Sequence, residues 1–176
     1  MRDLTNKETV VEFMRLFGRH AKKTTRVYFT GGVSAVLKGW RDSTIDIDLR
    51  FEPDADELYR AIPKLKEELH INLEVASPSD FIPQLPGWED RSEFIRNEGN
   101  ANFYHYDFYS QALSKIERGH DKDRIDVFEM IRCELVDPRK LQLLFSEIEP
   151  QLYRYPAISP QKFAESVREA VSQASL

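Results

Sequence analysis

The sequence predicts an α+β fold, in which a small mixed β-sheet is flanked by helices and is followed by a helical C-terminal half. Two observations support this class. Short segments that alternate apolar and polar residues, as strands with one buried face do, occur in the first 107 residues. After them, apolar residues recur at helical spacing to about residue 172. We expect an α/β core over residues 1–107 and a helical extension over residues 108–176, packed together as one compact unit.

Six elements are predicted in the first 75 residues from apolar spacing and from the glycines and capping residues between the segments. In order, they are a helix over 7–20, a strand over 26–30, a short helix over 33–37, a strand over 45–51, a helix from 54 and a strand over 71–75. Thr5 and Glu8 form a capping-box pattern before the first helix. Because the segment over 45–51 alternates strictly, we expect Ile45, Ile47 and Leu49 to face the core.

The next part of the chain changes character. Residues 77–87 hold three prolines and a glycine, which predicts a loop with at most one short turn. Phe81 and Trp88, in and just after this loop, are expected to pack against the protein, and the alternative is that they stack on a base. A strand is predicted over 103–106. Helices follow, and the last two begin at Asp-Pro and Ser-Pro pairs, where proline suits the first helical position.

Composition and charge restrict the function classes. Apolar residues make up 41% of the chain and charged residues 31%, as in ordinary globular proteins. The net charge of −5 argues against a general nucleic-acid binder, which is normally basic. A single cysteine, Cys133, excludes an intramolecular disulfide and a cysteine-based zinc site. Since no stretch approaches the ~20 apolar residues of a membrane span, we expect a cytoplasmic protein without a membrane partner.

Asp46 and Asp48 are the first candidate site residues. They are two positions apart on a predicted strand, so their side chains project from the same face. Two adjacent carboxylates repel each other unless a cation lies between them. Hard oxygen ligands of this kind suit Mg²⁺ or Mn²⁺. Taken alone, such a pair is more typical of an exposed strand face that has no ligand.

Gly31 and Gly32 follow the first predicted strand, and Ser34 lies just after them. Glycine permits close backbone approach and a positive φ, and the amides that enter the next helix would point at an anion. Taken alone, the pair is typical of a tight strand-to-helix turn. Combined with the acid pair, it would place phosphate-binding groups beside a metal site, which is the arrangement that phosphoryl transfer requires.

Two segments carry a family resemblance: Tyr-Phe-Thr-Gly-Gly-Val-Ser-Ala over 28–35 and Thr-Ile-Asp-Ile-Asp-Leu over 44–49. They resemble the signature of the DNA polymerase β-like nucleotidyltransferase superfamily, and the residues before the acids also resemble its minimal nucleotidyltransferases and AbiEii-type toxins. The resemblance implies that the paired acids bind two divalent ions, completed by a third acid from a later strand. By position this acid is Glu74, although the family often has Asp there. Asp80 is the runner-up, and an exposed residue without a role is the alternative.

A second resemblance covers residues 109–126, which are similar to the lysine helix and the Arg–Asp–x–x–Asp helix of AbiEii-like proteins. In those proteins the lysine lies near the nucleotide phosphates, which implies this role for Lys115. Lys122 and Asp123 stand where the family has Arg-Asp. We expect Asp123 to orient Lys115 or Arg118, or to approach the catalytic face. An ordinary charged helix–turn–helix surface is the alternative.

The sequence therefore predicts a metal-dependent nucleotidyltransferase. It would move a nucleoside monophosphate from a nucleoside triphosphate to a hydroxyl of RNA, a protein or a small molecule, with two Mg²⁺ or Mn²⁺ ions. The predicted catalytic and metal-binding residues are Asp46, Asp48 and Glu74. The predicted nucleotide-binding residues are Gly31, Gly32, Ser34, Lys115, Arg118 and Asp123. Its predicted setting is a toxin–antitoxin system, with an antitoxin or another protein as partner.

Two alternatives stay open. The first is a catalytically inactive module that has the nucleotidyltransferase fold and acts through a protein partner. The second is a metal-dependent hydrolase that uses the same carboxylates.

Overall fold

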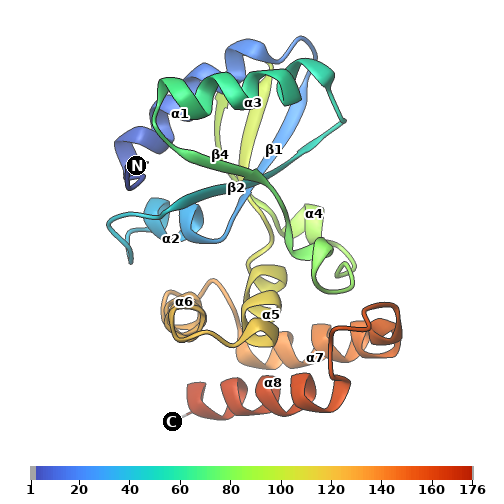
Figure 1. The fold of residues 1–176 in the computed structure, drawn as a ribbon. Helices are drawn as coiled ribbons and strands as arrows, with labels where there is room; N and C mark the ends of the chain where they lie inside the picture. The colour runs from blue at the N-terminus through green and yellow to red at the C-terminus, as the bar shows by residue number, and fades with distance from the viewer. Residues whose placement is uncertain (1–2, 176) are drawn as a thin grey trace. The chain divides into compact units, whose positions relative to one another are not determined.

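The computed structural model describes residues 3–175, and residues 1, 2 and 176, at the ends of the two predicted domains, lie outside the described residues. Within that range the chain forms eight α-helices and one five-stranded sheet (Figure 1). The α+β class, the mixed sheet and the helical C-terminal half are as predicted. The chain divides into two units. The sheet unit runs to Ser77 and resumes over Ser92–Tyr106, whereas the helical unit holds Pro78–Arg91 and the chain from Asp107 onward.

The sheet unit contains three helices and all five strands. In chain order these are α1 (Lys7–His20), β1 (Thr25–Thr30), α2 (Gly32–Lys38), β2 (Asp46–Glu52), α3 (Asp56–Glu68), β3 (Asn72–Val75), β4 (Glu93–Glu98) and β5 (Ala101–His105). The strand order is β3-β2-β1-β5-β4. The β1–β2 and β4–β5 pairs are antiparallel, whereas β1–β5 and β2–β3 are parallel, so the sheet is mixed.

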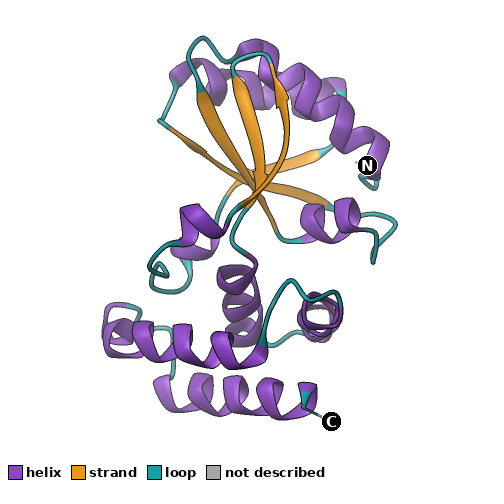
Figure 2. Ribbon diagram, turned by 180° about the vertical axis from the view of Figure 1, so that it is seen from behind, coloured by secondary structure: helices purple, strands orange, loops and turns teal. Residues whose placement is uncertain are grey.

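Helices α1 and α3 lie side by side over one face of this sheet (Figure 2). The core between these helices and the sheet is rich in aromatic side chains. Phe13 stacks on Phe17 within α1, with ring centroids 5.2 Å apart, and Phe29 of β1 stacks on Phe103 of β5 at 5.5 Å. Alternate strand residues face these helices, because side chains alternate along a strand. The residues between them therefore point to the opposite face, which we call the second face.

The helical unit contains five helices and two 3₁₀ turns. They are η1 (Pro78–Asp80), α4 (Trp88–Arg91), α5 (Phe108–Arg118), α6 (Asp121–Arg132), α7 (Pro138–Ile148), η2 (Glu149–Arg154) and α8 (Pro160–Ala174). Helices α7 and α8 pack together, with the rings of Phe145 and Phe163 at 4.9 Å between centroids. Asp137 and Ser159 cap these two helices with their side chains, and a proline follows each cap, as predicted.

Several local predictions were wrong. Asn6, rather than Thr5, caps α1 by accepting a hydrogen bond from the Thr9 amide at 2.9 Å, because the backbone of Thr5 is already paired with that of Thr44. Ile45 is 60% exposed, since β2 begins only at Asp46. Strand β4 was missed because this edge strand is mostly exposed and its sequence does not alternate.

No helix among residues 3–175 is both long enough and apolar enough to cross a membrane.

The two aromatic residues of the predicted loop over 77–87 and its end differ in burial. Trp88 is buried, as the packing prediction requires, whereas Phe81 is exposed.

The packing of α1 on the sheet depends on a close backbone contact at Gly18. A methyl group on this residue would lie 2.3 Å from the Glu98 carbonyl oxygen of β4. We expect Gly18→Ala to lower the free energy of unfolding by about 1–3 kcal/mol, because helix and strand must move apart. Urea denaturation measures this change, with Arg19→Ala, at an exposed neighbour on α1, as the control. Unchanged stability of Gly18→Ala would contradict the contact.

Candidate active site

The sheet register places the two aspartates on the second face. Asp48 lies opposite Thr30 of β1 and Glu74 of β3, and Asp46 lies opposite Asn72 of β3. Both aspartates are half-buried, whereas Ile47 between them is fully buried on the helix-covered side. The backbone of β2 therefore presents two carboxylates side by side, as the alternation predicts.

Asp46 is oriented by its neighbours. The side-chain amide of Asn72 donates a hydrogen bond to Asp46 Oδ1, and the Thr44 hydroxyl donates to the Asp46 backbone carbonyl at 3.2 Å. An amide donor fixes one carboxylate oxygen and leaves acceptor positions for another ligand. The sequence analysis missed Asn72. The signal was its position two residues before Glu74, because residues at i and i+2 of a strand share a face.

The Gly-Gly turn lies directly against the acid pair. Gly31 has a φ of +66°, and a methyl group there would lie 2.9 Å from Asp48 Oδ2. A methyl group on Gly32, where α2 begins, would lie 2.1 Å from the Thr44 hydroxyl oxygen. Both positions therefore require glycine, one for its backbone conformation and both for space. This close approach is what the sequence analysis expected of the two glycines.

Ser34 does not project from the second face. It is fully buried in α2, and its hydroxyl oxygen lies 2.9 Å from Nδ1 of His105, the last residue of β5. Burial, together with the positive charge of Lys38, lowers the pKa of His105 to about 3. The imidazole is thus neutral at pH 7. The sequence analysis did not select His105, which the parallel pairing of β5 with β1 brings beside the Gly-Gly turn.

Glu74, the predicted third acid, is more exposed than Asp46 and Asp48. Glu74 is in register with Asp48 but is exposed on the short strand β3. Within residues 3–175, no three Asp, Glu, His or Cys side chains lie close enough together to hold a metal ion. The runner-up, Asp80, lies in η1 of the helical unit. The assignment of Glu74 as a third metal ligand stays a prediction.

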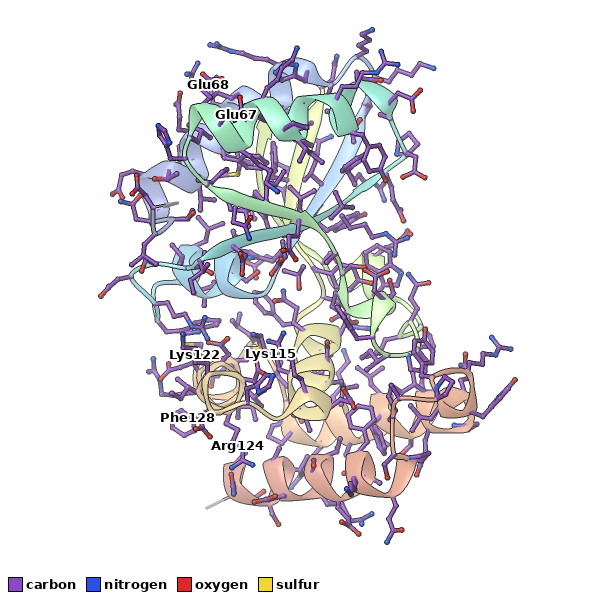
Figure 3. The ribbon with its side chains drawn as sticks, viewed as in Figure 1. Glu67, Glu68, Lys115, Lys122, Arg124 and Phe128 are labelled. Atoms are coloured by element: carbon purple, nitrogen blue, oxygen red, sulfur yellow. The ribbon has the colours of Figure 1, made fainter. Side chains whose placement is uncertain are left out.

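In the helical unit, Lys115 (labelled in Figure 3), Arg118 and Asp123 form an ion cluster with Asp126, in which Arg118 is exposed and the other three side chains are buried. Lys115 Nζ lies 2.7 Å from Asp126 Oδ2 and 3.5 Å from Asp123 Oδ1, and Arg118 Nε donates to Asp123 Oδ2 at 2.8 Å. Asp123 thus contacts both Lys115 and Arg118. Burial raises the pKa of Asp123, but the hydrogen bond from Arg118 and the charges of Lys115 and Arg118 outweigh this, so the pKa lies below its ordinary value.

A separate buried carboxylate begins the second segment of the helical unit. Asp107 is fully buried, caps α5 by accepting from the Tyr109 and Ser110 amides, and receives two hydrogen bonds from Arg91, at 3.1 and 2.8 Å. The pair ties α4 to α5. The sequence analysis missed it, since nothing local to Asp107 points to an arginine 16 residues earlier.

Residues 7–168 match the model of a family described as nucleotidyltransferase of unknown function (DUF6036). The chain belongs to this nucleotidyltransferase family. The match covers most of both units and confirms the predicted nucleotidyltransferase family. Neither the comparison with curated proteins nor that with solved structures gave a match.

The buried histidine makes the stability of the chain depend on pH. Unfolded His105 binds a proton below its ordinary pKa of 6.5, whereas the folded protein resists protonation down to about 3. Stability is therefore lost as pH falls through this window, by up to about 1.4 kcal/mol per pH unit. We expect His105→Gln to flatten the stability profile between pH 6.5 and 4.5, as measured by urea denaturation. His20→Gln, at an exposed site, is the control, and parallel profiles for His105→Gln and the wild type would refute the assignment.

Proposed function

We propose that the chain transfers a nucleoside monophosphate from a nucleoside triphosphate to a hydroxyl group and releases pyrophosphate. The observation that carries this proposal is the carboxylate pair on the second face, with Asp48 directly against the Gly-Gly turn and Asp46 held by Asn72. The family match supports the same class of reaction.

The donor set fits a divalent cation. Asp46 and Asp48 supply hard carboxylate oxygens from one strand face, and Mg²⁺ in proteins typically uses one or two carboxylates together with substrate phosphates. These two residues would hold Mg²⁺ or Mn²⁺, with Glu74 as the proposed third ligand. Two bound ions would neutralise phosphate charge and make the attacking hydroxyl more acidic.

In the proposed reaction, the acceptor oxygen forms a bond to the α-phosphorus, and the bond from that phosphorus to the β-phosphate oxygen breaks. Pyrophosphate leaves with the bonding electrons, and Glu74 accepts the hydroxyl proton. Gly31 and Gly32 allow the backbone to come close to the phosphates without a side chain in the way. Because its hydroxyl is buried against His105, Ser34 would support the turn, and any direct contact with the triphosphate requires it to reorient.

Lys115 is the proposed triphosphate ligand of the helical unit, by its resemblance to the lysine of AbiEii-like proteins. Asp123 and Asp126 hold its ammonium group in one position, and Arg118 neutralises part of the charge of Asp123. An ammonium group is a compact charge suited to phosphate oxygens, and binding them requires Lys115 to exchange an aspartate partner for a phosphate oxygen. Lys115, Arg118 and Asp123 would thus act as a group.

The acceptor is proposed to be a hydroxyl of RNA, a protein or a small molecule. The acidic chain disfavours extended nonspecific contacts with nucleic acid but is compatible with a local one. A role in a toxin–antitoxin system, with an antitoxin or other protein partner in the cytoplasm, extends the proposal. A catalytically inactive binding module is the second candidate. It is favoured because Glu74 is exposed and, within residues 3–175, does not form a group of three possible metal ligands with Asp46 and Asp48.

A transfer assay tests the proposal. Each α-³²P-labelled nucleoside triphosphate is incubated with the protein, Mg²⁺ or Mn²⁺, cellular RNA and lysate. We expect label to move into one acceptor, and Asp46→Asn/Asp48→Asn to lower the rate on the order of 10²-fold or more, because lost electrostatic contacts to the reacting phosphate cost that much.

The matched control is Asp54→Asn/Asp56→Asn. This pair has the same spacing and charge change but lies at the start of α3. Full transfer by the Asp46→Asn/Asp48→Asn protein would sink the mechanism, and equal loss in the control would show that the effect is not specific to β2.

A further inference from the structure

A second site lies wholly within the helical unit, in a groove between α6 and α8. Its volume is ≈ 420 Å³, and the C-terminal end of α5, with Lys115 and Ile116, also lines it. Pockets of roughly 300–1,000 Å³ are the size that holds small organic ligands. The groove contains neither Asp46 nor Asp48, and Lys115 is the one proposed nucleotide-binding residue among those that line it.

The walls of the groove differ in character. Helix α6 presents apolar side chains, including Val127, Phe128 and Ile131, and Phe128 is 62% exposed. Helix α8 faces them with the small residues Ala170 and Ala174. Because these side chains are short, the space in front of α6 stays open. A ligand with an apolar body would fill it and remove the Phe128 ring from water, which is favourable in proportion to the area covered.

One cation on the rim is available to a ligand. Arg124 of α6 lines the groove and is exposed (Figure 3). No carboxylate or hydrogen-bond acceptor within the described residues, 3–175, engages its guanidinium group. The other two cations that line the groove are already engaged. Lys115 is held by Asp123 and Asp126, and Arg132 pairs with Glu129 at 2.7 Å.

We propose that this groove binds an organic anion with an apolar body and one small head group, a carboxylate or a phosphate monoester. The apolar part lies against Val127, Phe128 and Ile131, and the head group binds Arg124. Glu169 on the α8 side adds a negative charge, which favours a head group that carries few charges.

Binding of 8-anilinonaphthalene-1-sulfonate, an aromatic body with one anionic group, tests the proposal by fluorescence. We expect saturable binding to the full chain with one site, displaced by decanoate. Decanol, which has the same chain length but no charge, should displace it at least about tenfold less well, and Arg124→Gln should weaken decanoate binding by about tenfold, as expected for a charge-assisted hydrogen bond.

Two variants separate the groove from nonspecific binding. Ala170→Phe should abolish binding by filling the groove, and Ala174→Phe serves if the first variant fails to show the near-ultraviolet circular dichroism of the wild type. Arg168→Gln, on α8 but outside the lining, should bind like the wild type. Equal displacement by decanol and decanoate, or binding unaffected by Arg124→Gln, would overturn the proposal.

Discussion

The close approach of Asp48 to Gly31 is the contact on which the candidate site depends. A methyl group at Gly31 would lie 2.9 Å from Asp48 Oδ2, so the turn after β1 lies directly beside the second face of β2. The antiparallel pairing of β1 with β2 brings Thr30 opposite Asp48, one residue before the turn. Two carboxylates from one strand, one of them beside the backbone turn, are the arrangement on which the proposed cation site rests.

The helical unit buries a positive charge and pairs it with carboxylates. Lys115 is only 6% exposed, and a buried ammonium group is costly unless it is paired. Asp123 and Asp126, three residues apart on α6, provide that pairing, and Arg118 shares Asp123. The four formal charges of the cluster cancel. The two aspartate contacts hold the ammonium group of the lysine in place. Arg124, one residue after Asp123, lies outside this cluster, and that is why its charge is available to a ligand.

The local parts of the site were predictable from the sequence, and the long-range parts were not. Strict alternation around Asp46 and Asp48 predicts their shared face, and the Gly-Gly pair predicts the close turn, because each depends on neighbouring residues. The contacts of Asn72 with Asp46 and of His105 with Ser34 depend on strand order, and pairs 26 and 71 residues apart leave no periodic signal. Strand β4 was missed for the related reason that an edge strand buries little apolar surface.

The central claim is that the β2 carboxylates bind a divalent cation together with a triphosphate. Calorimetric titration with α,β-methylene nucleoside triphosphates, with and without Mn²⁺, tests it most directly, because no acceptor is needed. We expect Mn²⁺ to raise the affinity of the wild-type chain for the triphosphate by at least about tenfold, and Asp48→Asn to remove this gain while thermal unfolding shows an intact fold. Equal affinity with and without Mn²⁺ in the wild type would contradict the claim.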